Sequence, residues 1–576
     1  MPANTPHVNK HSVVLCWHMH QPDYRDANGH FQQPWTYLHA IKDYTDMAAH
    51  LERSNDCCVN INFTPILLDQ LRAYRDNISC YFETANPSVL CDSLLTALVS
   101  ETLDNDPHVR MNLLERCLKI NQRHCIERYS YYAMLADFAR QVLKQSQRID
   151  YINEGLAFDL LVWYHLAWMG EFIKQQDFRF HRLVDQGRQF SMEHRRQVLQ
   201  MLHDYLKELL QRYSHLVQVG KVELSMTPYA HPIAPLLMDL QCAKQAIPDI
   251  ALPQAHSYPG GEKRLRWHIE RGLSVFEECF GQRPTGCWPA EGAIDDKSLA
   301  VLDHYRFDWV ASGGMVLKYS LAPSLHSIGQ VADECLQAVY QLPHKRLNNF
   351  FRNDELSDLI GFTYSSWHAD DAVADLIHRL ENIANKSADK PNSVTVIALD
   401  GENAWEYYPN NGFYFLQALY KRLSEHPRLR LTSFSQVLKA SEPAQRHPLN
   451  KIIAGSWVYG NLATWIGDEE KNRAWDMLTE AKQCFDRAIV TGKLGPAQIE
   501  AAEVRLGVCE GSDWFWWFGD DNPAATTAVF DHLFRSHLIA LYQLLDQAPP
   551  AYLAEPFTRP HAEKALPLGG TMRKAE

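Results

Sequence analysis

The segment VTVIALDGENAW, residues 394–405, joins an apolar run directly to two carboxylates and an indole. Its first six residues are typical of a strand covered on both faces, as in a parallel sheet. Asp400 and Glu402 follow without a spacer, and Trp405 comes three residues later. Carboxyl groups at the mouth of a sheet are candidates for proton transfer to and from a bound substrate.

Three further predicted strands also end in histidine, carboxylate or tryptophan side chains. In CWHMHQPDY, the strand end places His18 and His20 on the same side of an extended chain. The other two strand ends, in ELSMTPYAHP and GCWPAEGAIDD, carry Glu223, His231, Trp288 and Glu291. Because chemistry in α/β folds gathers at the carboxyl ends of parallel strands, the four ends together predict one site.

Each of these residues also has a purely structural interpretation. Glu291 can cap a helix that begins near Ala293, and Asp400 can be a turn residue before Gly401. Paired histidines at a strand end are often core or loop residues, and a single tryptophan is a core residue by default. The convergence of four strand ends, rather than any one residue, favours a functional site.

Short predicted strands separated by helices run through most of the chain. Residues 13–17 and 59–63, and the segments VELSM, GCWPA, DWVASG and VTVIALD, have the pattern of buried strands. Such alternation predicts an α/β fold with a parallel sheet, either open or closed into a barrel.

Helical patterns interrupt and follow these strands. Between about residues 67 and 216 the apolar residues recur at three- and four-residue spacing, and two more helical stretches lie near residues 469–488 and 526–545. We therefore expect a catalytic body over residues 1–440 that contains a helical insertion, a helical region over 441–550, and a tail over 551–576.

The composition narrows the class of protein. The 576 residues are 46% hydrophobic and 22% charged, as in a soluble globular protein, and the formal charge of −13 argues against a nucleic-acid binder. The apolar run before His18 is too short for a signal peptide, no stretch predicts a membrane span, and the 13 scattered cysteines suit reduced thiols. These features predict a cytoplasmic location, with no nucleic-acid or membrane partner.

Two carboxylates beside tryptophan and histidine, without a phosphate loop or a Cys or Ser nucleophile elbow, favour glycoside chemistry. One carboxyl group protonates the leaving oxygen, and the other attacks the oxocarbenium-like carbon or activates water against it. A separation of about 5–5.5 Å retains the configuration and one of about 6.5–9.5 Å inverts it. With 15 Trp and 25 Tyr, the chain has ample aromatic rings for stacking on sugar faces.

Five segments, in order along the chain, resemble the motifs of glycoside hydrolase family 57. They are HMHQP (18–22), ELSMTPYAHPIAPLL (223–237), CWPAEG (287–292), ALDGENAWE (398–406) and GSWVYGNLATWIGDEEKNRAW (455–475). EGSDWFWWFGDDN (510–522) also resembles the α-amylase and amylopullulanase-like branch of that family.

This resemblance implies an incomplete (β/α)7 barrel with a helical C-terminal domain that contributes to an α-glucan cleft. It implies that Glu291 is the catalytic nucleophile and Asp400 the general acid/base of a retaining reaction, and we expect no metal and no cofactor. The predicted substrate-binding residues are His18, His20, Glu223, His231, Trp288, Glu402, Trp405, Trp457, Trp465, Asp513 and Trp516.

Within the family, the residues of the motifs favour α-amylase-type hydrolysis of α-1,4 bonds in starch, glycogen or maltodextrin, and they leave α-1,6 cleavage open. A 4-α-glucanotransferase is the alternative, because transfer depends on the shape of the subsites, which motifs hardly encode. Two other classes stay open: a metal-dependent carbohydrate hydrolase that uses the strand end with His18 and His20, together with His231, and a catalytically silent glucan-binding module.

Overall fold

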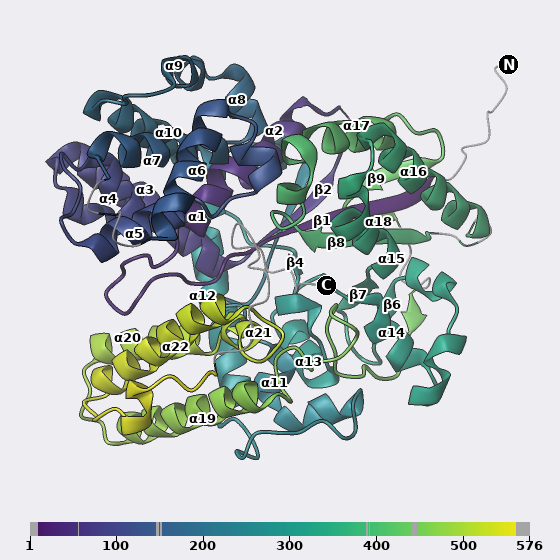
Figure 1. Cartoon of the computed structure of the whole chain (residues 1–576). Coiled ribbons are helices and arrows are strands. Elements are labelled where there is room, and N and C mark those ends of the chain that lie inside the picture. The colour runs from purple at the N-terminus through teal and green to yellow at the C-terminus, as the bar shows by residue number, and fades with distance from the viewer. Residues whose placement is uncertain are drawn as a thin grey trace, which may run out of the picture.

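The computed structural model describes residues 10–55, 57–145, 149, 152–387, 390, 392–440 and 446–559 of the chain (Figure 1). Among these residues, ten strands form one sheet in the order β10-β6-β7-β5-β4-β3-β2-β1-β8, with β9 paired to β1. Their bounds are β1 (His11–Met19), β2 (Val59–Phe63), β3 (Val222–Met226), β4 (Gly286–Cys287), β5 (Trp309–Ser312), β6 (Tyr340–Gln341), β7 (Asn348–Phe351), β8 (Val394–Asp400), β9 (Leu429–Thr432) and β10 (His447–Pro448).

The sheet curls into an incomplete barrel. The run β8-β1-β2-β3-β4-β5-β7 is parallel throughout, and only β6 joins β7 in the antiparallel sense. Just beyond β7, Arg352 forms an isolated bridge with Val396 of β8, where the Asn353 N–H donates to the Val396 carbonyl over 2.7 Å. The two ends of the parallel run therefore meet at a single bridge and do not pair as neighbouring strands. This confirms the predicted incomplete (β/α)7 barrel.

The alternation of side chains along β1 explains its nearly continuous apolar sequence. Leu15 and Trp17 belong to the large core beneath the helices, whereas Val14 and Cys16 belong to a second core with Ala398 and other residues of the neighbouring strands. A strand covered on both faces needs apolar residues at successive positions. The prediction of a buried parallel sheet is therefore confirmed.

The helical insertion lies between β2 and β3, as the sequence predicts. In Figure 1 it forms a group of blue and purple helices beside the sheet. After the short α1 (Trp35–His39) and α2 (Thr45–Arg53) ahead of β2, its helices are α3 (Pro65–Thr84), α4 (Ser93–Val99), α5 (Pro107–Arg116), α6 (Ser130–Leu143), α7 (Glu154–Trp168), α8 (Glu171–Gln176), α9 (Phe178–Gln186) and α10 (Met192–Gln218).

Further helices connect the later strands of the barrel. They are α11 (Ala234–Met238), α12 (Gly261–Phe280), α13 (Asp296–His304), α14 (Gly314–Leu321), α15 (Asp354–Asp358), α16 (Ala369–Lys386), α17 (Phe413–Ser424) and α18 (Phe434–Ala440). Strands β6, β7, β9 and β10 were not predicted from the sequence; β6 and β10 have two residues each, and β7 begins with two asparagines.

The C-terminal region is helical, and Figure 1 shows its yellow-green helices together at one side of the barrel. They are α19 (Glu469–Val490), α20 (Pro496–Cys509), α21 (Ser512–Trp517) and α22 (Ala524–Leu544). The predicted helices at 469–488 and 526–545 are confirmed. Part of the predicted tail is structured, since a 3₁₀ turn at Ala551–Ala554 buries Leu553, and residues 560–576 lie outside the described part.

A buried ion network ties this helical region to the barrel. Glu510, just after α20, accepts hydrogen bonds from the Arg264 Nε and from His268 Nε2 of α12, each at 2.8 Å. Tyr258 donates its hydroxyl to the same carboxylate over 2.5 Å. Because α21 begins two residues after Glu510, this network fixes where the start of α21 meets the barrel.

Candidate active site

Glu291 lies just beyond the short strand β4, in a 3₁₀ turn at Ala290–Gly292. Its backbone is left-handed, with φ of 56°, which is rare for a residue that has a β-carbon. The Trp457 indole N–H donates to Glu291 Oε2 over 2.8 Å, and the Trp457 backbone N–H donates to the Glu291 carbonyl over 3.0 Å. Backbone strain that surrounding contacts maintain is a frequent property of catalytic positions.

Asp400 is the last residue of β8 and pairs in register with His18 of β1. A β-carbon at Gly401 would lie 2.1 Å from the Met19 sulfur, so a larger residue there would force the buried Met19 side chain to move. The side-chain amide of Asn403 donates to Asp400 Oδ2 over 2.6 Å. The chain turns after β8, so the Asp400 side chain lies at the C-terminal end of the strand. Asn403 holds the Asp400 carboxyl group through one of its oxygens.

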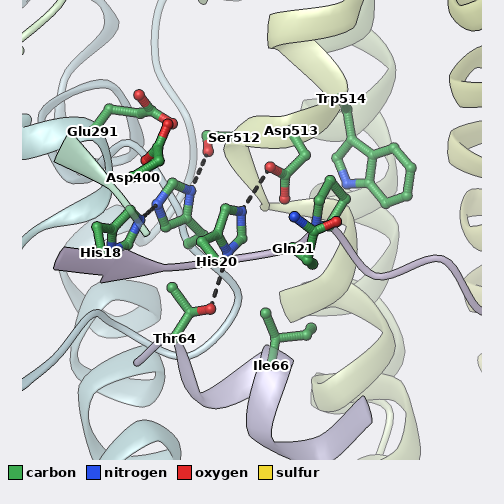
Figure 2. Close-up of polar contacts among 12 residues, drawn as sticks. His18, His20, Gln21, Thr64, Ile66, Glu291, Asp400, Ser512, Asp513 and Trp514 are labelled. Carbon is green, nitrogen blue, oxygen red and sulfur yellow. Dashed lines mark hydrogen bonds and ion pairs between the residues drawn. The ribbon is translucent and has the colours of Figure 1, made fainter. Parts of the chain in front are cut away.

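Glu291 and Asp400 line the same cavity, whose volume is about 410 Å³. Figure 2 shows the two side chains together beside the His18–His20 end of β1. Of the predicted residues, this cavity is lined by His20, Glu291, Asp400, Glu402, Trp457 and Trp516. A larger cavity of about 780 Å³ lies in the helical insertion and contains no predicted site residue.

The two carboxyl groups influence each other's protonation. Burial raises the pKa of Glu291 well above its usual range, and the Asp400 charge adds to this, whereas the Trp457 N–H and Arg352 oppose it. Burial also raises the pKa of Asp400 to about 6, against the effects of Asn403, His20 and Arg352. Since the charges interact, the pair takes up and releases protons as a unit. The pair therefore holds a proton at a pH where an ordinary carboxyl group is ionised.

His18 and His231 form a neutral hydrogen-bonded pair. The Asn62 side-chain oxygen, which only accepts, lies 2.7 Å from His18 Nδ1, so that nitrogen carries the proton. His231 Nε2 then donates to His18 Nε2 over 3.1 Å, and His231 Nδ1 accepts from the Ser512 hydroxyl over 2.8 Å. Burial lowers the pKa of His18 to about 3 and that of His231 well below its usual range, which agrees with neutral rings.

His20 lies between the N-terminal strand and the C-terminal helices. Its Nδ1 is 2.9 Å from the Thr64 hydroxyl, and its Nε2 is 2.8 Å from Asp513 Oδ1 at the start of α21 (Figure 2). The predicted alignment of His18 and His20 is confirmed, since their rings stack at 5.7 Å. His20 lines the cavity, so Asp513 and Thr64 fix the orientation of a ring that a ligand can reach.

The donor atoms of His20, His231 and Asp513 lie within 4.8 Å of one another, a spacing compatible with one metal ion. The rings of His20 and His231, however, stack with planes 15° apart and centroids 3.7 Å apart. Nitrogen lone pairs lie in the ring plane, so those of two stacked rings do not converge on one point. The described geometry therefore favours a hydrogen-bonded array over a metal centre.

Glu402 presents a third carboxyl group to the cavity. Its Oε1 accepts from the Gln21 side-chain amide over 3.0 Å, and its Oε2 has no hydrogen-bond partner among the described residues. Burial, followed by the charge of Asp400, raises the pKa of Glu402 well above its usual range. Burial thus favours the neutral form of Glu402, which can donate a hydrogen bond to a ligand.

The structure overturns the prediction that Glu223 binds substrate. This residue lies near the N-terminal end of β3, opposite Asn60, whereas the candidate site is at the carboxyl ends of the strands. Its carboxylate accepts from the Trp309 indole over 2.7 Å and from the Ser435 hydroxyl over 2.8 Å. Glu223 thus stabilises the opposite end of the barrel.

Three predicted tryptophans are core residues rather than cavity walls. Trp288, Trp405 and Trp465 are 0% exposed, and none of them lines the cavity. The Trp405 indole donates back to the Gly401 carbonyl over 2.8 Å and packs against Trp17, 5.6 Å away. Trp288 packs against Trp457 and Trp465 against Trp516, two residues that line the cavity. The three buried rings thus lie behind the cavity wall, and the prediction of direct substrate contact is wrong for them.

Arg352, which was not predicted as a site residue, lines the cavity just beyond β7. Its guanidinium lies 4.9 Å from the centroid of the Trp457 ring and pairs with Asp354 over 2.7 Å and with Asp358 over 3.2 Å. The signal was present, because Arg352 directly follows the apolar pair of NNFF, another strand end. The exposed rings of Phe362 and Tyr459 also line the cavity and carry no strand-end signal.

The sequence profile described as Glycosyl hydrolase family 57 matches residues 14–454, which is most of the 576-residue chain. The chain belongs to glycosyl hydrolase family 57. This membership makes the chain a glycoside hydrolase by family and confirms the resemblance seen in its motifs. No curated protein matches the chain.

Several solved structures share this fold. A GH57 branching enzyme from Thermococcus kodakaraensis has a TM-score of 0.57 and 13% identity, covering 93% of this chain and 90% of that chain. An alpha-amylase from Thermotoga maritima has a TM-score of 0.56 and 13% identity, covering 93% of each chain. A 4-alpha-glucanotransferase from Thermococcus litoralis has a TM-score of 0.52 and 12% identity, covering 93% of this chain and 60% of that chain. At these identities the likeness shows the fold alone.

Across the described ranges, no helix has both the length and the apolar character that a membrane span requires.

Proposed function

We propose that this family 57 enzyme is a retaining hydrolase that cleaves α-1,4 bonds of starch, glycogen or maltodextrin. Glu291 is the nucleophile and Asp400 is the general acid/base. The observation that carries the proposal is the shared cavity, in which the two carboxyl groups interact electrostatically and the Trp457 N–H holds one oxygen of Glu291. Two carboxyl groups on one cavity are what a covalent glycosidase needs.

In the first step, Glu291 attacks the anomeric carbon of the sugar and the glycosidic bond breaks. The proton of Asp400 passes to the leaving oxygen, so the departing glucan leaves as a neutral alcohol. In the second step, Asp400 takes a proton from a water molecule, which attacks the same carbon and releases Glu291. Each half-reaction inverts the carbon once, and the two together retain its configuration.

The protonation of the pair changes during this cycle. Before the first step the pair carries one proton, because burial and the charge of Asp400 disfavour a second charge on Glu291, and the reaction starts from the form in which Asp400 holds that proton. Once Glu291 carries the sugar as an ester, its charge is absent. Asp400 is then the base that accepts the proton of the incoming water.

Other residues hold the substrate or the groups that touch it. His20, Glu402, Trp457 and Trp516 line the cavity and are assigned to sugar contacts. Asp513 hydrogen-bonds to His20, and the hydrogen-bonded pair of His18 and His231 stacks on the His20 ring, so these three residues are assigned to fixing His20.

The division of the chain into a catalytic body over 1–440 and a helical domain over 441–550 is part of this proposal. Its support is that the C-terminal region supplies groups to the cavity. Trp457 and Trp516 line it, and Ser512 and Asp513 bind His231 and His20 from outside the barrel. The domain would therefore complete the cleft rather than merely follow the barrel.

The products formed from maltoheptaose and pullulan test the activity. Only shorter maltodextrins, released with retained anomeric configuration, support hydrolysis, and maltotriose from pullulan adds α-1,6 cleavage. Products longer than maltoheptaose would instead identify a 4-α-glucanotransferase, and an inverted product would refute the covalent mechanism. The Glu291→Gln variant is the control, because it keeps the shape of the cavity and lacks the nucleophile.

A further inference from the structure

Two exposed aromatic rings line the cavity that contains Glu291 and Asp400. Phe362 is 49% exposed and Tyr459 is 70% exposed, whereas Glu291 in the same cavity is 5% exposed. This gradient places the catalytic carboxyl group deep in the cavity and the two rings at its mouth. Exposed rings add little to the core, so their presence at a cavity points to a ligand with flat apolar faces.

The loop that carries Tyr459 is held in one conformation. Tyr459 itself is left-handed, with φ of 55°, and Gly460 follows with φ of 70°. The Ser456 hydroxyl donates to the Asn461 carbonyl over 2.8 Å, which closes the loop across Tyr459. A β-carbon at Gly455 would lie 2.2 Å from the Gly460 carbonyl oxygen, so the two backbone segments are in close contact. A hydrogen bond and close backbone packing therefore hold the turn that carries Tyr459. Its left-handed backbone is strained, which is typical of a functional position.

Phe362 also lies on a stretch of backbone with an unusual conformation. It lies in a single π-helical turn, Leu359–Thr363, that directly follows α15. The Tyr408 hydroxyl donates to the Ile360 carbonyl over 2.6 Å and anchors the start of this turn, where Ile360 is fully buried. Isolated π-helical turns are common at functional sites, because the extra residue redirects the side chains that follow.

We infer that Phe362 and Tyr459 form an outer sugar-binding subsite, which engages glucosyl units beyond the two that flank the cleaved bond. The inference rests on the proposed function for the identity of the ligand, an α-1,4-glucan. Tyr459 lies two residues from Trp457, which binds the nucleophile, and Phe362 follows the Arg352–Asp358 ion pair on the cavity wall. A glucan seated at Glu291 and leaving through the mouth passes these rings.

The subsite makes the enzyme selective for chain length. A short substrate that fills only the buried part of the cavity gains nothing from the outer rings, whereas a long one stacks its apolar sugar faces on them. Each stacked ring is worth roughly a 2- to 12-fold gain in affinity, by analogy with aromatic pairs. The gain should therefore appear in kcat/KM for maltoheptaose and not for maltotriose.

The test compares maltoheptaose with maltotriose in the Phe362→Ala and Tyr459→Ala variants. We expect each variant to lose about 2- to 12-fold in kcat/KM for maltoheptaose and to be unchanged for maltotriose. Tyr459→Phe keeps the ring and should retain the preference for maltoheptaose that Tyr459→Ala loses. Tyr414→Ala is the matched control, since Tyr414 is an aromatic residue that is 56% exposed and does not line the cavity. Equal losses on both substrates, or no loss on either in both variants, would overturn the subsite.

A binding measurement separates this inference from the proposed function. In the Glu291→Gln background, calorimetry gives the affinity for maltoheptaose and maltotriose without turnover. If the wild type binds both sugars but cleaves neither, the proposed hydrolase activity fails, and a maltoheptaose-specific loss of affinity in Phe362→Ala still upholds the subsite. If the sugars are cleaved and Phe362→Ala and Tyr459→Ala bind both as wild type does, the subsite fails and the hydrolase stands.

Discussion

The hydrogen bond from the Trp457 indole to Glu291 offers a direct test of the nucleophile. Trp457→Phe removes the N–H that lies 2.8 Å from Glu291 Oε2 and keeps an aromatic ring between Trp288 and Arg352. The N–H favours the ionised form of Glu291, so its loss raises the pKa of this carboxyl group. Since the nucleophile must be ionised, the acid limb of the pH profile should move to higher pH.

The size of the shift follows from the geometry. A hydrogen bond to a charged group in a buried site is worth about 1.5–3 kcal/mol. One pKa unit corresponds to about 1.4 kcal/mol, so the acid limb should rise by roughly 1–2 pH units. On that limb kcat/KM should fall about 10- to 100-fold, and above the limb the variant should approach the wild type.

The assay is the pH dependence of kcat/KM for maltoheptaose, measured as release of reducing ends. Trp465→Phe is the matched control, because the Trp465 indole N–H is buried without a hydrogen-bond partner among the described residues and does not line the cavity. An unchanged acid limb in Trp457→Phe, or the same shift in Trp465→Phe, would show that Glu291 does not control this limb and would refute the reasoning.

Three further predictions concern single carboxyl groups. Glu291→Gln should lower kcat by several decades while glucan binding in calorimetry stays near wild type; retention of more than about a tenth of kcat would remove Glu291 from the role of nucleophile. Asp400→Asn should slow the first step for natural glucans far more than for glycosyl fluorides, whose leaving group needs little protonation, and equal losses would exclude Asp400 as the acid. Glu510→Gln should destabilise the protein by about 3–5 kcal/mol in denaturant titrations near neutral pH, because it leaves the buried Arg264 without its partner. Against the effect of burial, Arg264 and His268 lower the pKa of Glu510 from 4.5 to about 2. The wild type therefore holds this stability above about pH 4.5 and loses it as the pH falls toward 2, so the difference between the two proteins should shrink in acid.

Much of the fold could be predicted because its signals are local. The runs that become β1, β2, β3, β5 and β8 are buried on both faces or nearly so, and their apolar sequences show it. The insertion and the helices α19 and α22 carry apolar residues at helical spacing. Strands β6 and β10 have only two residues each and pair with each other, so tertiary contact rather than local sequence makes them strands.

The candidate site was predicted in part for the same reason. The carboxyl ends of parallel strands meet at one edge of the sheet. A strand-end pattern in each separate segment therefore predicts that Glu291, Asp400 and His20 lie together, and all three line one cavity. The same rule failed for Glu223, which stands at the beginning of its strand rather than its end. Family motifs did not distinguish Trp457, which binds Glu291, from Trp405, which lies in the core.

The sequence by itself determined the parallel α/β fold, because strand and turn preferences act over a few residues. Its motifs also nominated Glu291 and Asp400, the catalytic pair that we propose. Only the tertiary structure decided which tryptophans face the cavity, that Arg352 and the rings of Phe362 and Tyr459 join it, and how the protons of the carboxyl groups are held. The direction of a side chain and the degree of its desolvation depend on segments far away in the chain. Asp513 reaches His20 across 493 positions, and the Trp457 N–H reaches Glu291 across 166. No local pattern encodes contacts of that range, since they form only when the barrel and the C-terminal helices pack together.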